Sequence, residues 1–309
     1  MGDQQTTSLT SWLILFILAF TWGSSFILMK YILFTADGEP LFSATQVACI
    51  RLSLAGLVLL PIALRNLKVL RKNFWPLLIV GLFGNGFPAF FFPLAQQHLD
   101  SSFVGMLNSL VPFFTLMIAI FVFKTKVQSL QIFGVVIGLL GAISLISLGG
   151  GGGEFNIGYS MFVVGATISY GISVNTIKNV LNHVNSVVIA ALALGLMGIP
   201  AGIYLLTTDF VPIVTETEGG LRGLGFGAIL AIVGTAGALI IFNKLVKDTS
   251  AVFASSVTYV IPIFAVLWGV FDDEKFTFLH AISGAVVLLG VYLVNLGGRR
   301  MRRKERLKS

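Results

Sequence analysis

Polar side chains inside long apolar stretches are the residues of this chain whose types and spacing could do chemistry. One set follows the period of a single helical stripe, i, i+3, i+4 and i+7: Ser255, Thr258, Tyr259 and Pro262. A proline inside a helix removes a backbone hydrogen bond, so Pro262 frees the carbonyl group of Thr258 and Pro112 frees that of Asn108. In lipid, a freed carbonyl must find a partner or line a wet cavity. We therefore expect Asn108 and the stripe to contact a substrate, with Pro112 and Pro262 as kinks or gates; the alternative is a structural kink whose polar groups bond neighbouring helices.

Further polar and aromatic side chains lie in the middle of other apolar stretches. They are Trp22, Ser24, Ser25, Asn85, Tyr170, Asn175 and Thr235. Trp22 and Tyr170 lie too deep in their stretches for the usual anchoring of aromatic rings at a membrane surface. We expect this pair to face each other across a cavity, where the rings could stack on a substrate ring or hold a cation. For each polar group the alternative is an ordinary hydrogen bond between helices.

Charged side chains are almost absent from the same stretches. All thirteen acidic residues lie in loops, tails or at the ends of stretches. Intramembrane carboxylates are the usual carriers of protons and cationic drugs, so their absence argues against a proton-coupled antiporter for such drugs. Lys30 and Arg51 are the only cations well inside. Either they extend to the outer surface, or they pair with a carboxylate on the substrate, which favours an anionic or zwitterionic metabolite over a cation.

Residues typical of catalytic and metal sites are too few and too scattered. Cys49 is the only cysteine, and His98, His183 and His280 lie far apart without neighbouring ligands. This pattern argues against a nucleophile, an acid–base pair and a metal centre. The segment "GGGGGEF" (149–155) lacks the Lys-Ser/Thr that a phosphate-binding loop requires. We therefore expect no catalytic residue, no metal and no cofactor, and predict that the protein is not an enzyme.

The composition indicates which solvent surrounds these residues. The chain has 309 residues, of which 56% are hydrophobic and 11% charged, and its mean hydropathy is +0.94. Water-soluble chains are about 25% charged, so most of this surface must face lipid. A spanning helix needs about 20 apolar residues and bonds its backbone within its own segment. These lengths predict ten spanning helices: 11–34, 43–64, 75–96, 101–123, 128–148, 157–177, 186–207, 221–243, 250–271 and 277–297.

The charges of the connecting loops predict how the chain is oriented. Basic and acidic loops alternate along the sequence, and the tail 299–309 is strongly basic. Because basic loops remain in the cytoplasm, both termini are predicted to be cytoplasmic, with the protein in the plasma (inner) membrane. Much of the net charge of +7 lies in the tail, directly after an apolar stretch. This position favours anionic lipid headgroups over nucleic acid as the partner of the tail.

An internal repeat explains the alternation of loop charge. At an offset of 150 residues, Pro112 corresponds to Pro262 and Lys124 to Glu274. We therefore predict two five-helix repeats. Since five is an odd number, the second repeat starts on the opposite face of the membrane, which places Lys124 inside and Glu274 outside. Inverted repeats of this kind are typical of secondary transporters. The chain then divides into a first repeat, a Gly-rich linker, a second repeat and a basic tail, at 1–148, 149–156, 157–298 and 299–309.

At these residues the chain resembles the drug/metabolite transporter superfamily, in its ten-span EamA-type branch. The resemblance rests on "TWGSSF" (21–26), on Arg51 within "CIRLSLAGLVLL" (49–60), and on the spacing of Pro262, Glu274 and Gly284. The first repeat departs from the family's pattern, because Lys124 occupies the position of the usual acid. The resemblance implies an all-α integral membrane protein, a basket of ten helices around a central cavity that spans one, three, four, six, eight and nine line. It also implies export or exchange of small metabolites, including amino acids.

The sequence thus predicts a secondary transporter, not driven by ATP, that exports small metabolites such as amino acids by alternating access. Its expected partners are a small-molecule metabolite and the lipid bilayer, and not nucleic acid; the sequence indicates no oligomeric state. A channel or a non-transporting membrane receptor is the alternative. A membrane-embedded enzyme is less favoured, because the catalytic groups discussed above are missing.

Overall fold

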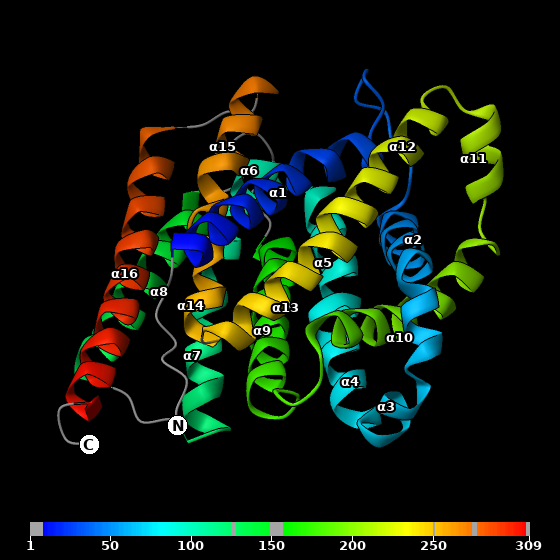
Figure 1. Cartoon of the computed structure of the whole chain (residues 1–309). Helices are drawn as coiled ribbons and strands as arrows, with labels where there is room; N and C mark the ends of the chain where they lie inside the picture. The colour runs from blue at the N-terminus through cyan, green and yellow to red at the C-terminus, as the bar shows by residue number, and fades with distance from the viewer. Residues whose placement is uncertain (1–8, 125–127, 149–156, 250, 274–276, 307–309) are drawn as a thin grey trace.

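The computed structural model describes residues 9–124, 128–148, 157–249, 251–273 and 277–306 (Figure 1). Within these ranges the regular secondary structure is helical, apart from one isolated β-bridge between Phe34 and Pro40. The predicted linker 149–156 and Glu274 lie outside the described residues. The all-α fold class predicted from the sequence is therefore confirmed for the part of the chain that the structure describes.

Eight helical stretches among the described residues are long and apolar enough to cross a membrane. Four are single helices: α1 (Leu9–Leu33), α2 (Ala44–Arg65), α9 (Ile157–Asn179) and α10 (Ser186–Leu205). Four are interrupted: Phe74–Gln96, Ser101–Phe121, Gly220–Asp248 and Phe253–Phe271. Two shorter apolar helices, Ser129–Gly141 and Phe278–Gly290, belong to α8 (Ser129–Leu148) and α16 (Phe278–Arg306). Each of the ten predicted stretches thus falls on a helical stretch, and a membrane crossing by all ten stays a prediction.

The outer surface of the molecule is apolar. Several helices carry large hydrophobic side chains that are exposed over most of their area. The exposed fraction is 72% for Trp75, 71% for Phe121 and 81% for Phe271. Soluble monomers rarely expose extended apolar surface. These side chains fit a lipid environment, which is what the composition requires.

Two of the interrupted stretches contain a π turn at equivalent positions. In the first, η1 (Leu82–Gly86) joins α4 (Phe74–Gly81) to α5 (Phe87–Gln96); in the second, η3 (Ile232–Gly237) joins α12 (Gly220–Ala231) to α13 (Ala238–Asp248). Each turn places a polar side chain against the carbonyl group five residues earlier. Asn85 Nδ2 donates to the Val80 oxygen at 3.4 Å, and Thr235 Oγ1 donates to the Leu230 oxygen at 3.0 Å. Single π turns inside α-helices are frequent at functional sites.

The other two interrupted stretches contain a short 3₁₀ turn before a proline. They are built from α6 (Ser101–Leu107), η2 (Asn108–Leu110) and α7 (Val111–Phe121), and from α14 (Ala251–Ser255), η4 (Ser256–Tyr259) and α15 (Ile261–Phe271). Pro112 and Pro262 lie in the first turn of α7 and α15. A proline is well tolerated there, because the N–H groups of a first turn have no partner within the helix. The kinks predicted at these prolines thus take the form of new helix starts.

Helices α7 and α15 match each other in length and in how they end. Each has 11 residues, and each is followed by a non-glycine residue with positive φ, Lys124 at 51° and Asp273 at 57°. In Figure 1 the chain descends from α6 to α7 and rises from α14 to α15, so the two segments run in opposite directions. The sequence offset of 150 residues pairs Lys124 with Glu274. By backbone conformation, the counterpart of Lys124 is instead Asp273, the residue before Glu274.

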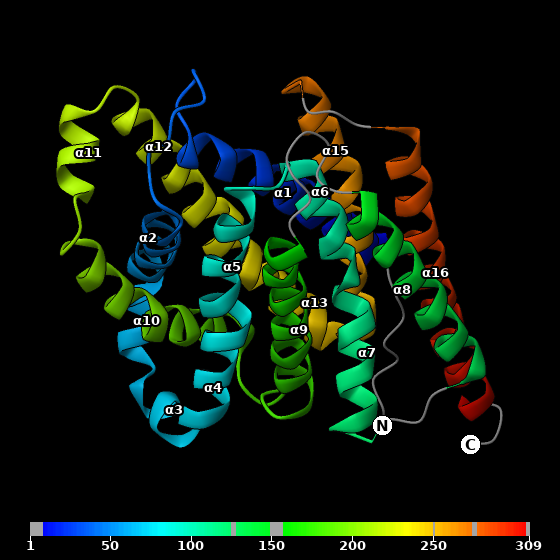
Figure 2. The same cartoon turned by 180° about the vertical axis from the view of Figure 1, so that it is seen from behind.

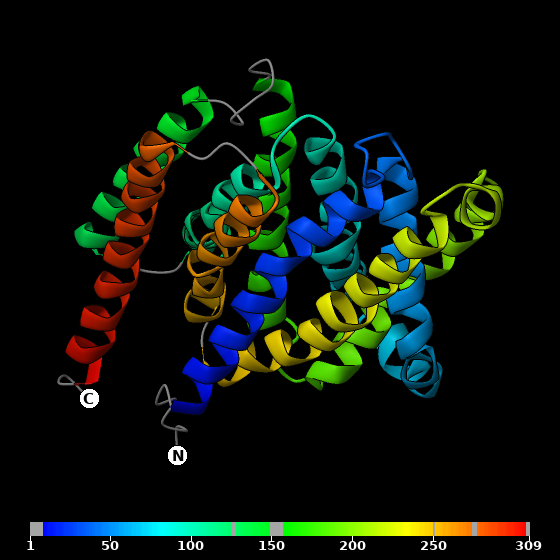
Figure 3. The same ribbon diagram turned by 90° about the horizontal axis from the view of Figure 1, so that it is seen from above.

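Helix α9 lies at the centre of the bundle, packed between α5 and α7 (Figure 2). Helices α8 and α16 pair along one edge, and α1 packs against α12 on the face seen in Figure 3. Two short helices that the sequence analysis did not predict, α3 (Leu67–Lys72) and α11 (Phe210–Glu216), lie toward the opposite edge. The interrupted helices therefore surround α9, and α8 with α16 stands outside this group.

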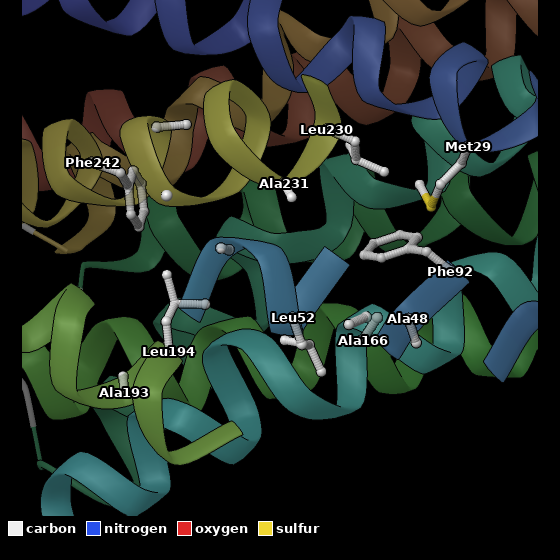
Figure 4. Close-up of a cluster of buried hydrophobic side chains, with 14 of the residues drawn as sticks. Met29, Ala48, Leu52, Phe92, Ala166, Ala193, Leu194, Leu230, Ala231 and Phe242 are labelled. Atoms are coloured by element: carbon white, nitrogen blue, oxygen red, sulfur yellow. The ribbon is translucent and has the colours of Figure 1, made fainter. Parts of the chain in front are cut away.

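Helices α2 and α10 cross in close contact. Gly198 of α10 faces Gly56 of α2, and a Cβ atom at Gly198 would lie 2.5 Å from the carbonyl oxygen of Leu52. Small residues at a helix crossing let two backbones approach in this way. Leu52 and Leu194 belong to the buried hydrophobic cluster in Figure 4, which continues into α12. This crossing positions the part of α2 that carries Arg51.

Candidate substrate cavity

A cavity lies where the interrupted helices meet α1 and α9. Its described lining includes residues from all six spans that the family resemblance implies, together with Arg51 of α2 and Ala190 and Ala193 of α10. None of the described lining residues belongs to α8 or α16. The cavity has a volume of about 80 Å³, and one ordered water needs about 10–15 Å³ on this measure. The space thus suits a small metabolite.

Eight of the residues predicted from the sequence line this cavity: Trp22, Ser25, Arg51, Asn85, Asn108, Tyr170, Ser255 and Thr258. They come from seven different elements, so only the tertiary fold brings them together. Asn85, Asn108 and Thr258 lie within the π and 3₁₀ turns, where the helices depart from regular geometry. The interruptions therefore contribute three of the polar residues in the cavity wall.

Aromatic rings form a second part of the wall. The predicted pair Trp22 and Tyr170 both line the cavity, and each packs against a different ring. Trp22 meets Phe242 edge-on with centroids 5.0 Å apart, and its Nε1 donates to the Gly234 oxygen at 2.9 Å. Tyr170 stacks on Phe92 with centroids 6.0 Å apart. The rings are held in place by these contacts and present a fixed apolar surface.

Arg51 is the only charged residue in the described lining of the cavity. Its Nε donates to Thr235 Oγ1 at 2.8 Å, and its guanidinium interacts with the hydroxyl group of Tyr170. Thr235 lies in the π turn η3 and is itself fixed by its bond to Leu230. The Arg51 side chain therefore points toward the cavity instead of extending to the outer surface.

Lys30, the second intramembrane cation, is placed differently. It forms an ion pair with Asp272, which directly follows α15. The hydroxyl group of Tyr31 donates to the same carboxylate at 2.9 Å. This cluster joins the end of α1 to the end of α15 and lies outside the cavity lining, so Lys30 already has an acidic protein partner.

Two predicted polar residues bond other helices and lie outside the described lining. Ser24 Oγ accepts a hydrogen bond from Trp268 Nε1 at 2.8 Å. Asn175 Nδ2 donates to the carbonyl oxygens of Thr115 and Gly171 at 2.8 and 2.9 Å. The contacts with Trp268 and Thr115 correspond to the alternative of hydrogen bonds between helices, whereas Gly171 belongs to the same helix as Asn175.

The remaining predicted residues do not belong to the described lining of the cavity. Thr235 contacts Arg51 and thereby acts on the lining indirectly. Pro112 and Pro262 shape the starts of α7 and α15 without lining the cavity. The hydroxyl oxygen of Tyr259 is buried without a hydrogen-bond partner among the described residues, and Tyr259 lies outside the described lining.

Two polar lining residues were missed by the sequence analysis, Ser173 and Asn243. A signal for Ser173 was present, because Tyr170, Ser173 and Ile177 repeat at helical spacing and all three line the cavity. Asn243 directly follows Phe242 near the end of a predicted span, and nothing in its local sequence distinguishes it from a residue at the membrane surface. Among the described residues, no group of three or more His, Cys, Asp or Glu side chains could hold a metal ion.

The fold and the cavity define the protein as a multi-pass helical membrane protein with a small central cavity. Comparison with known sequences then gives the family. The EamA-like transporter family matches residues 10–147 and, a second time, residues 157–296. The chain therefore belongs to the EamA-like transporter family, and the resemblance to the drug/metabolite transporter superfamily is confirmed.

Several relatives that match this chain over most of their length are named as transporters. An "Uncharacterized transporter" of Archaeoglobus fulgidus is 23% identical over 285 residues, which cover 92% of this chain and 98% of the relative. The "Uncharacterized inner membrane transporter YedA" of Escherichia coli K12 is 28% identical over 297 residues, which cover 92% and 90%. A crystal structure at 18% identity matches with a TM-score of 0.65 over 94% of this chain and 98% of its own, which supports the fold alone.

Proposed function

We propose that this protein is a secondary transporter that exports small metabolites, such as amino acids, across the inner membrane by alternating access. The observation that carries the proposal is the position of the cavity. It lies where four interrupted helices meet. Two of these helices are interrupted by a π turn, and the other two by a 3₁₀ turn before a proline. Secondary transporters commonly bind substrate at discontinuous helices near the middle of the membrane.

The proposed architecture has ten spans in two inverted repeats, with both termini in the cytoplasm. The repeats occupy 1–148 and 157–298, separated by the linker 149–156 and followed by the basic tail 299–309. The matched lengths and ends of α7 and α15 support this division, and so do their opposite directions in Figure 1. Two copies related in this way can exchange conformations, so that one state opens inward and its near mirror image opens outward.

The interrupted helices offer a physical basis for such an exchange. A regular α-helix resists bending because each backbone N–H is bonded four residues back. In η1, η2, η3 and η4 this pattern is broken, and all four turns contribute residues to the cavity wall. Substrate that contacts these turns can therefore bias the positions of the helix halves on either side of them.

Counterflow in proteoliposomes tests the proposal. Liposomes that contain purified full-length protein are loaded with unlabelled amino acids, and uptake of labelled amino acids is followed. A carrier gives saturable uptake that is stimulated by substrate on the opposite side, whereas a channel gives flux without trans-stimulation. Asn108→Leu combined with Thr258→Leu should abolish uptake while the protein still folds, because both residues line the cavity. Unchanged uptake in this double variant, or flux without trans-stimulation, would contradict the proposal.

A further inference from the structure

The polar groups in the cavity differ in charge and in whether their hydrogen-bonding atoms have a partner. We infer that the cavity recognises a small organic carboxylate that also carries a hydrogen-bond donor, with the carboxylate on Arg51 and the donor on Asn108 Oδ1. This inference rests on the transport function proposed above and names the substrate class of the same cavity. Three observations carry it: two concern the carboxylate, and one concerns the hydrogen-bond donor.

The first observation is that Arg51 is held in position for a ligand. Its Nε is bonded to Thr235, and Thr235 is anchored in the π turn η3. A guanidinium has five N–H donors in a rigid planar fork, so these contacts fix its plane and leave terminal N–H groups for a further acceptor. Carboxylates match this fork with two parallel hydrogen bonds.

The second observation is that no acidic residue in the described part of the chain pairs with Arg51. The ion pairs among the described residues join Lys30 to Asp272 and Lys244 to Asp248, and no carboxylate of this part of the chain pairs with Arg51. The described cavity lining also holds no Asp or Glu that could balance the charge. A charge inside a membrane is costly and normally pairs with an opposite charge or serves a substrate path. A carboxylate on the substrate completes the pair that the protein leaves open.

The third observation is an unpaired acceptor in the same cavity. Asn108 is only 4% exposed and lines the cavity, and its Oδ1 has no hydrogen-bond partner among the described residues. A buried polar atom without a partner costs about 1–3 kcal/mol, and such groups are rare in folded proteins. An acceptor of this kind is satisfied by an N–H or O–H group on the substrate. The rest of the ligand then meets aromatic rings, including Trp22 and Phe92.

Equilibrium binding to the purified full-length protein tests this inference without knowledge of the natural substrate. The probes are valine, 2-hydroxy-3-methylbutanoate, 3-methylbutanoate and valinamide, which share one carbon skeleton. The first two carry both a carboxylate and a donor, the third lacks the donor, and the fourth lacks the carboxylate. We expect the first two to bind more tightly than the others, by roughly ten-fold or more. Equal binding of the acid and its amide, or no binding of any acid at millimolar concentration, would overturn the inference.

Variants assign the two contacts. Arg51→Gln should weaken binding of the acids by roughly ten- to hundred-fold. Arg65→Gln is the matched control, because it removes the same charge from an exposed position at the end of the same helix. Asn108→Ala should remove the preference for the hydroxy acid over 3-methylbutanoate. If Arg51→Gln weakens acid binding no more than Arg65→Gln does, the assignment is wrong; the comparison of acid with amide needs no variant and stands even if Arg51→Gln fails to fold.

Counterflow with the same compounds separates this inference from the proposed function. An acid that binds through Arg51 and is not exchanged would refute transport of that class and leave the binding site intact. Exchange of amides that is as fast as exchange of acids, and is insensitive to Arg51→Gln, would refute the carboxylate site and leave the transport function standing.

Discussion

The crossing of α2 and α10 offers a quantitative test of the packing that positions the cavity. Gly198→Ala would place a Cβ atom 2.5 Å from the Leu52 carbonyl oxygen and 3.1 Å from the Gly56 Cα. Both neighbours are backbone atoms, so no side chain can rotate away and the two helices must move apart. Overpacking of this kind costs about 1–3 kcal/mol.

Gly225→Ala is the matched control. Gly225 lies in α12, and a Cβ atom there would meet nothing within 4 Å. Both substitutions gain the same intrinsic preference of alanine over glycine in a helix, about 1 kcal/mol in water. The difference between the two variants removes this gain, whatever its size in lipid. We expect Gly198→Ala to be less stable than Gly225→Ala by about 1–3 kcal/mol.

The assay is reversible unfolding of the purified protein in mixed micelles with increasing SDS. Because α2 carries Arg51, Gly198→Ala should also weaken ligand binding, whereas Gly225→Ala should leave it unchanged. Equal free energies of unfolding for the two variants, within about 0.5 kcal/mol, would refute the close approach of α2 and α10.

Three further predictions concern single contacts around the cavity. Thr235→Val removes the acceptor of Arg51 Nε, so binding of carboxylic acids should weaken several-fold in the equilibrium assay. Asp272→Asn removes the ion pair with Lys30 and should destabilise the protein by up to about 1 kcal/mol in SDS unfolding, since the pair is partly exposed; the exchange Lys30→Asp with Asp272→Lys should restore part of this loss. Trp22→Phe removes the indole donor to a backbone carbonyl and should cost about 1 kcal/mol or more on the same scale.

Controls separate these contacts from general damage. Thr235→Ser keeps the hydroxyl group and should restore acid binding, which a merely structural role for the Thr235 methyl group would not allow. Trp75→Phe changes the same residue type at a site that is 72% exposed, and it should leave the free energy of unfolding nearly unchanged. A double exchange at Lys30 and Asp272 that is no more stable than Asp272→Asn would contradict the ion-pair argument.

The positions of the helices followed from local sequence, because a backbone in lipid must bond within its own apolar stretch. The breaks before Pro112 and Pro262 were also predictable from local sequence, because proline has no backbone N–H to bond the preceding turn. The π turns η1 and η3 were not predicted. Their polar residues, Asn85 and Thr235, were predicted from the sequence as substrate contacts. The turns themselves were not, because the extra residue of a π turn does not change the pattern of one polar group in an apolar stretch.

The directions of single side chains were less predictable than the helices. Ser24 and Ser25 are neighbours, yet Ser24 accepts a bond from Trp268 and Ser25 lines the cavity. The difference arises from which helix packs against each face of α1, and this is a tertiary property. Lys30 and Arg51 were likewise indistinguishable in sequence, and the nearest acidic residue decides between them: Asp272 lies beside Lys30, and no described acid pairs with Arg51.

The central claim is that two five-span halves lie in opposite orientations in the membrane, and cysteine labelling tests it most directly. Cys49 is the only native cysteine, so a Cys49→Ala background allows one new cysteine at a time. Lys124 and Asp273 are the non-glycine residues with positive φ that follow α7 and α15. We predict that a membrane-impermeant thiol reagent labels Asp273→Cys in intact cells and reaches Lys124→Cys only after the membrane is permeabilised. Labelling of both positions from the same side would contradict the inverted arrangement and the alternating-access mechanism that depends on it.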